Sequence, residues 1–150
     1  MLALLGSLRI WCGINIKICI VGRGFEAFKA ELEREGKLQV VGAVVNLADW
    51  YRDAHFEIAS IFDGSGMKNK VAEALMFGNK TIGTPEAFSS YKDVVKRAGW
   101  CCDTVEDFIL AISCAKKVIK RSFDAELRQL YEELYSQSVA KLRLKRILTE

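Results

Sequence analysis

The residues best suited to chemistry lie in one short stretch, in which a glycine-rich turn leads into a helical pattern. The turn and the start of the helix are formed by Gly64, Ser65, Gly66, Met67 and Lys68. A turn of this kind at a helix N-terminus leaves several backbone N–H groups without helical partners, which favours binding of an anion, most often a phosphate. Lys70 adds positive charge on the same helical face as Glu73, and the Glu73 carboxylate could accept a hydrogen bond from a sugar hydroxyl. The stretch therefore predicts a phosphate site with an acid beside it.

A second glycine-rich turn follows an earlier apolar run. The segment Gly22-Arg23-Gly24-Phe25-Glu26-Ala27 fits the loose GxGxxA form of the dinucleotide fingerprint. That fingerprint requires an acid at the end of the next strand, but the sequence there reads Gly42-Ala43-Val44-Val45-Asn46. NAD binding is therefore disfavoured, and a tight strand-to-helix turn is the simpler interpretation. Arg23 could still contact a phosphate.

Other kinds of site find little support in the composition. The only histidine, His55, disfavours a zinc site and a Ser-His-Asp or Cys-His mechanism. The five cysteines are irregularly spaced, which fits a reducing compartment and predicts a cytoplasmic location. A formal net charge of +3 is too small to indicate nucleic acid but suits an anionic ligand.

Strand and helix patterns alternate along the chain. Strands are expected at residues 16–21, 38–45, 56–62, 80–84 and 99–102, and a further short strand at 1–7. Helices are expected at residues 25–35, 46–54, 68–78, 91–98 and 104–122, with a last helical stretch from 124 that breaks near 136–138. This alternation predicts an α/β, Rossmann-like fold, a parallel sheet with helices on both faces. We expect one domain over residues 1–150, with a core at about 16–115 and C-terminal helices at 116–150.

The stretch from Gly64 to Glu73, with the Phe-Gly-Asn-Lys-Thr-Ile-Gly-Thr that ends at Thr84, resembles the donor-binding half of GT-B glycosyltransferases. The relatives it resembles most are the retaining enzymes that build bacterial polysaccharides. The resemblance covers roughly residues 16–115 and is strongest at 64–84. It implies that the chain is one half of a GT-B architecture, the C-terminal domain that binds a nucleoside-diphosphate sugar as substrate, with no cofactor and no metal.

The resemblance also implies roles for individual residues. In this family the second acid of an acid–seven residues–acid motif binds the ribose, and Glu73 matches that position. The first acid, which contacts the donor sugar, is replaced by Ser65. The backbone N–H groups of Gly66, Met67 and Lys68 would then face the diphosphate or the sugar, with Lys70 close to a phosphate. Val44 and Val45 match the segment that holds the base through backbone contacts.

The resemblance leaves part of such an enzyme unaccounted for. A complete enzyme has a second Rossmann-like domain that binds the acceptor, so we expect a partner, either an N-terminal acceptor domain or a separate subunit. The alternative is a non-catalytic module that binds a nucleotide or nucleotide sugar together with a partner chain. An oxidoreductase fragment is disfavoured by the missing acid. The basic residues near the C-terminus could touch anionic lipid at the inner membrane face, although a solvated helix surface explains them as well.

Overall fold

The computed structural model describes residues 16–34, 36, 38–63, 68–119 and 123–149. The chain divides into two compact units, one running to Trp50 and the other beginning at Tyr51. The expected strand at residues 1–7 lies outside the described residues, as do Gly64, Ser65, Gly66 and Met67.

The first unit is built around two parallel strands, β1 (Ile18–Val21) and β2 (Leu38–Gly42). The connection between them contains the 3-10 helix η1 (Glu26–Phe28) and the short helix α2 (Lys29–Leu32). Leu32, Leu38 and Val40 are buried and form the small core of this unit. The short helix α3 (Leu47–Asp53) follows β2, and the boundary between the two units falls inside it.

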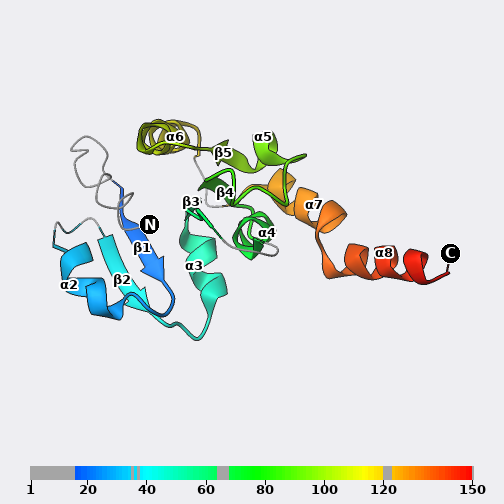
Figure 1. Cartoon of the computed structure of the whole chain (residues 1–150), viewed down its shortest axis with the longest axis horizontal. Coiled ribbons are helices and arrows are strands. Elements are labelled where there is room, and N and C mark those ends of the chain that lie inside the picture. Colours follow the sequence, from blue (N-terminus) through cyan, green and yellow to red (C-terminus); the bar gives the residue numbers. More distant parts are fainter. Residues whose placement is uncertain (1–15, 35, 37, 64–67, 120–122, 150) are drawn as a thin grey trace. The chain divides into compact units, whose positions relative to one another are not determined.

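The second unit contains a three-stranded parallel sheet in the order β3 (Phe56–Ala59), β4 (Lys80–Gly83), β5 (Gly99–Cys101). Helix α4 (Asn69–Met76) connects β3 to β4 and packs against both strands, and α6 (Val105–Val118) packs against β4. Figure 1 shows α4 and α6 on opposite sides of the sheet. Thr81 and Ile82 in the middle strand are fully buried, as expected for a parallel strand covered on both faces.

Apolar side chains from four helical or turn segments form the main core of the second unit. They are Val71 and Leu75 of α4, Phe88, Tyr91 and Val94 of the segment before α5 (Val95–Ala98), Ala98 of α5, and Leu127 and Leu130 of α7 (Ala125–Leu134). Burial of these side chains supplies the main stabilisation of the unit. The core holds α4 between the sheet and α7, and this fixes the direction in which the side chains of α4 point.

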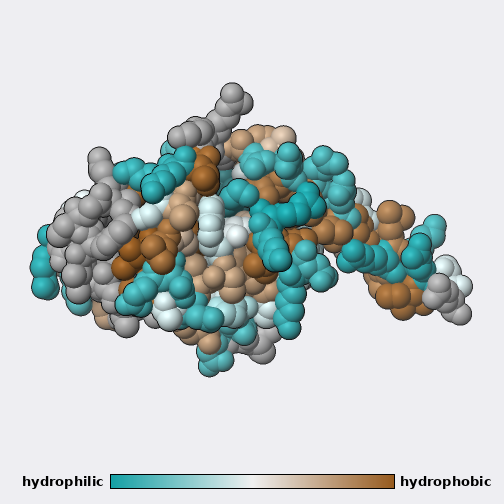
Figure 2. Space-filling model, turned by 90° about the horizontal axis from the view of Figure 1, so that it is seen from above, coloured by the Kyte–Doolittle hydropathy of each residue, from teal (hydrophilic) through white to brown (hydrophobic). Residues whose placement is uncertain are grey.

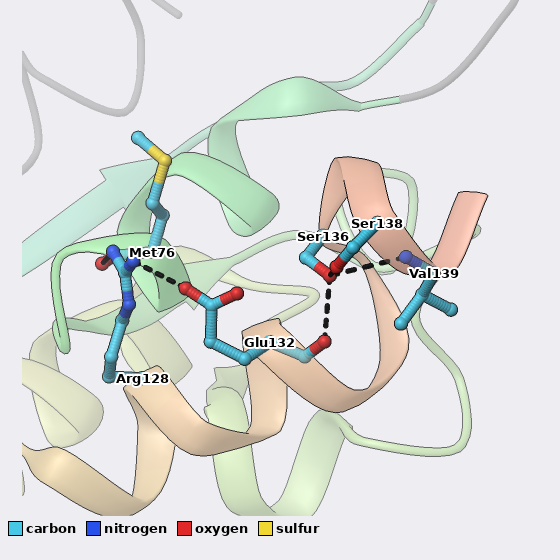
Figure 3. A network of polar contacts seen from close by, with 6 residues as sticks. All are labelled: Met76, Arg128, Glu132, Ser136, Ser138 and Val139. Atoms are coloured by element: carbon cyan, nitrogen blue, oxygen red, sulfur yellow. Dashed lines mark hydrogen bonds and ion pairs between the residues drawn. The ribbon is translucent and has the colours of Figure 1, made fainter. Parts of the chain in front are cut away.

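A chain of polar contacts connects α4, α7 and α8 (Gln137–Thr149), as Figure 3 shows. Arg128 donates a hydrogen bond to the Met76 carbonyl at 2.5 Å and forms an ion pair with Glu132. The Ser136 hydroxyl donates to the Glu132 carbonyl at 2.8 Å and accepts a bond from the Val139 N–H at 3.4 Å. The Ser136 side chain therefore links the last turn of α7 to the first turn of α8.

The predicted α/β fold with parallel strands and helices is confirmed. Each strand expected among the described residues is present. The second strand ends at Gly42 and the third at Ala59, so both are shorter than expected. The predicted break near residues 136–138 is confirmed by the gap between α7 and α8. The long helix begins with a capping box, in which Thr104 Oγ1 accepts from the Asp107 N–H at 3.2 Å and Asp107 accepts in turn from the Thr104 N–H at 2.9 Å.

Candidate functional site

The start of α4 is the part of the candidate site in which backbone N–H groups were expected to hold an anion. Lys68 occupies the N-cap position, and no side chain caps the helix there. The Lys68 side chain is buried, and its ammonium lies 2.9 Å from a carboxylate oxygen of Glu86, which follows β4. Lys68 therefore has a carboxylate partner within the protein, and its side chain ties the start of α4 to the loop after β4.

Glu73 is held in place by two hydrogen-bond donors. Its Oε2 atom accepts a bond from the Tyr51 hydroxyl at 2.9 Å and a bond from Lys70 Nζ at 3.0 Å. The Glu73 side chain keeps 32% of its surface exposed, so solvent or a ligand can still reach it. The i, i+3 spacing of Lys70 and Glu73 predicted that they share one face of the helix. In the structure they form a direct ion pair.

The Tyr51 hydroxyl also contacts an acid that the sequence analysis did not single out. Its oxygen lies 3.0 Å from Glu57 Oε1 as well as 2.9 Å from Glu73 Oε2. Glu57 lies on β3, and its second oxygen, Oε2, is buried without a hydrogen-bond partner. Burial raises the pKa of Glu57 to about 8, against the opposing effects of Lys70 and of the Tyr51 hydrogen bond.

Tyr51 is fixed by its own contacts. Its ring stacks on Phe77 with the ring centroids 5.1 Å apart, and its backbone carbonyl accepts a bond from Asn79 Nδ2 at 2.6 Å. Burial, together with the two neighbouring carboxyl groups, raises the pKa of Tyr51. The phenol therefore keeps its proton and remains a hydrogen-bond donor throughout the physiological pH range.

The predicted site residues of the first unit lie around its two strands. Arg23 is exposed in the turn after β1, Val44 is half-buried after β2, and Val45 is fully exposed. The Gly24 N–H donates to Glu26 Oε2 at 2.7 Å. Hydrogen bonds from the backbone N–H of Glu26 itself and from that of Gly24 lower the pKa of the Glu26 carboxyl. The turn is thus stabilised internally, by an acid from its own segment.

Sequence reasoning identified Lys68, Lys70 and Glu73, of which Lys68 is the N-cap of α4 and the other two lie within that helix. It missed Tyr51 and Glu57. The available signal was an acid at position 57 between Phe56 and Ile58 in an otherwise apolar strand, since an unpaired acid is rarely buried. Within the described ranges, no group of three or more His, Cys, Asp or Glu side chains could hold a metal ion.

The surface of α8 combines apolar and basic side chains, as Figure 2 shows for the C-terminal end of the chain. Its exposed apolar residues are Leu142, Leu144, Ile147 and Leu148. Its basic residues are Lys141, Arg143, Lys145 and Arg146. Of the helices in the part of the chain that the structure describes, none has the length and apolar character needed to cross a bilayer.

Comparison with protein families gives a match over most of the chain. The family described as "Glycosyl transferases group 1" matches residues 7–116, which include the candidate site residues on either side of the glycine-rich turn. No curated protein is significantly similar in sequence.

Proposed function

The chain belongs to the group 1 glycosyltransferase family, and from this we propose that it is the donor-binding half of a retaining GT-B enzyme. Its substrate would be a nucleoside-diphosphate sugar, from which the sugar is transferred to an acceptor held by an N-terminal domain or a separate subunit. The proposal extends to a role in polysaccharide synthesis in the cytoplasm.

The observation that carries this proposal is the arrangement around Glu73. A carboxylate that binds a ribose must be fixed in direction and still reachable, and Glu73 meets both conditions. Tyr51 and Lys70 engage the same oxygen, Oε2, so Oε1 remains for a ligand hydroxyl. A ribose hydroxyl that donates to a charged acceptor forms one of the stronger kinds of neutral–ion hydrogen bond.

The chemistry would require little from side chains. As the bond from the anomeric carbon to the diphosphate breaks, negative charge develops on the leaving group. Backbone N–H groups at a helix start and a nearby lysine stabilise such charge without reorganisation. Lys70, whose side chain is half exposed, is the described lysine suited to this role. The acceptor hydroxyl would enter from the same face as the departing diphosphate, as retention requires.

Calorimetric titration with UDP, GDP, UDP-sugars and NAD tests the proposal. We expect a nucleoside diphosphate to bind and Glu73→Ala to weaken it about tenfold or more, since a hydrogen bond to a charged group is lost. Glu133→Ala is the matched control, because Glu133 is an exposed helical glutamate whose partner is Gln129. NAD binding that depends on Gly22 and Gly24, with no binding of nucleoside diphosphates, would contradict the proposal.

The second candidate is a non-catalytic module that binds a nucleotide or nucleotide sugar and acts with a partner chain. It shares the binding prediction but not turnover. Release of nucleoside diphosphate from a nucleotide sugar by the isolated chain, measured in a coupled assay, would exclude it. Absence of turnover that is restored by an added acceptor-domain chain would support an enzyme assembled from two parts.

Peripheral contact with anionic lipid through α8 forms a further part of the proposal. Its exposed leucines and isoleucine alternate with lysines and arginines, the composition of helices that lie in the membrane interface. Co-sedimentation with vesicles tests it: binding to phosphatidylcholine vesicles that contain phosphatidylglycerol, and not to pure phosphatidylcholine, is expected. Equal recovery in the supernatant with both would leave α8 as a solvated helix.

A further inference from the structure

The two hydrogen bonds around the Tyr51 hydroxyl need more hydrogens than the hydroxyl itself can supply. The phenol has one hydrogen, yet its oxygen lies within 3.0 Å of a carboxyl oxygen of Glu57 and of a carboxylate oxygen of Glu73. If both acids were ionised, one of the two contacts would place two acceptors against each other without a hydrogen between them. A second hydrogen is therefore needed in this group of atoms.

The surroundings decide which acid carries that hydrogen. Glu73 already accepts a hydrogen bond from the ammonium of Lys70 at 3.0 Å, and its side chain is partly exposed to solvent. Glu57 has no cation at hydrogen-bond distance among the described residues, and its Oε2 is buried without a donor. A buried carboxylate oxygen without a donor is costly, whereas the carbonyl oxygen of a neutral acid is less so.

We infer that Glu57 is a neutral carboxylic acid that donates to the Tyr51 oxygen and thereby directs the Tyr51 hydroxyl toward Glu73. Tyr51 and Glu57 are then positioning residues, and Glu73 is the acid that touches the ligand. The chain of donors runs from Glu57 through Tyr51 to Glu73 Oε2, where Lys70 donates from the other side. This inference rests on the proposed function only for the ligand-binding role of Glu73.

The chain of donors makes the site sensitive to pH. The titratable groups that face Glu57 are Tyr51 of α3 and Lys70 and Glu73 of α4, while its register partner on β4 is the neutral Thr81. Loss of the Glu57 proton would leave one phenolic hydrogen for two anions. It would also add a negative charge beside the acid that is to receive the ligand. Both effects weaken binding of a nucleoside diphosphate as the pH rises through the Glu57 titration, near pH 8.

The protonation of Glu57 can be measured without any ligand. In protein labelled with ¹³C at the glutamate carboxyl carbons, NMR should show one resonance that titrates near pH 8 and is absent from Glu57→Gln. If every glutamate carboxyl titrates below about pH 6, close to its ordinary range, the inference is overturned.

The positioning role is measured by titration with UDP or GDP at about pH 7 and about pH 9, on either side of the Glu57 transition. We expect the wild-type affinity to fall about tenfold at the higher pH, as the charge change alters a hydrogen bond to an ion. Glu57→Gln should bind equally at both pH values, because its amide can donate to Tyr51 but cannot ionise. Tyr51→Phe should bind about tenfold more weakly than the wild type at about pH 7, while its ring can still stack on Phe77.

The outcomes separate this inference from the proposed function. Glu133→Gln should follow the wild type at both pH values, and thermal unfolding confirms that each variant is folded. If the wild type binds a nucleoside diphosphate, but Tyr51→Phe binds equally well and Glu57→Gln keeps the pH profile, the positioning role is refuted and the proposed function stands. If the wild type binds no nucleoside diphosphate, the proposed function fails, and the NMR titration still decides whether Glu57 is neutral.

Discussion

Replacing Glu57 by glutamine should change how the stability of the protein depends on pH. In the folded protein burial raises the pKa of Glu57 from 4.5 to about 8. The folded state therefore holds a proton between these values that the unfolded state has released. Stability is linked to the difference in bound protons, and here the unfolded state binds fewer, so the free energy of unfolding falls as the pH rises through this interval.

The size of the effect follows from the same shift. Each pH unit between the two pKa values costs ~1.4 kcal/mol, so the wild type loses about 3 kcal/mol between pH 4.5 and pH 7. Above about pH 8 the loss levels off, because both states are then ionised. Glutamine has the shape of the neutral acid and no proton to lose, so Glu57→Gln should lack this slope.

Thermal unfolding followed by circular dichroism provides the assay. The difference in Tm between Glu57→Gln and the wild type should be small near pH 4.5. It should grow to about 6–12 °C by pH 7, the shift that about 3 kcal/mol produces in a protein of this size. Glu133→Gln, on an exposed part of α7, should show no such growth. A Tm difference that is the same at both pH values would refute the reasoning, because it would mean that Glu57 ionises normally in the folded state.

Three further substitutions test helix capping and packing in the second unit. Thr104→Ala removes the cap of α6 and should cost about 1 kcal/mol, measured by urea unfolding. Arg128→Met removes the hydrogen bond to the last carbonyl of α4 and should cost about 1–2 kcal/mol, with faster hydrogen exchange in α7 as the readout. Gly78→Ala should cost about 2–3 kcal/mol in thermal unfolding, because φ is +69° there and a Cβ would lie 2.8 Å from the Asp124 backbone. Gly36→Ala is its control, with φ of +70° in open space, and should cost less.

The parts of the fold that could be predicted are those with local causes. The β-branched run before Gly22 and the spacing of Val71, Ala74 and Leu75 depend on neighbours in the sequence, and the structure has β1 and α4 there. The cap at Thr104 is likewise a contact over three residues. The division into two sheets could not be read from the sequence, because strand pairing joins residues about 20 positions apart, as in Ile18 with Leu38.

The same distinction between local and distant contacts explains which residues of the candidate site could be predicted. The acid at position 73 was found because a turn, a helix start and a lysine three residues earlier mark it locally. Tyr51, 22 residues away, was missed because nothing in its own neighbourhood distinguishes it from a core tyrosine. Glu57 was missed because the apolar run around it predicts a buried strand whatever residue stands at that one position.

The structure pairs each of the two lysines near the start of α4 with a carboxylate. The pairs differ in exposure. In the pair with Glu86, the Lys68 side chain is 8% exposed. Breaking such a buried pair leaves an uncompensated charge. In the pair with Glu73, the Lys70 side chain is 49% exposed. An exposed ion pair contributes about 0.2–1 kcal/mol to stability. In the proposed complex, a phosphate of the ligand would therefore draw Lys70 away from Glu73 at little cost. Glu73 would then keep the Tyr51 hydrogen bond as its fixed partner, so the direction of that one hydroxyl gains importance once a ligand binds.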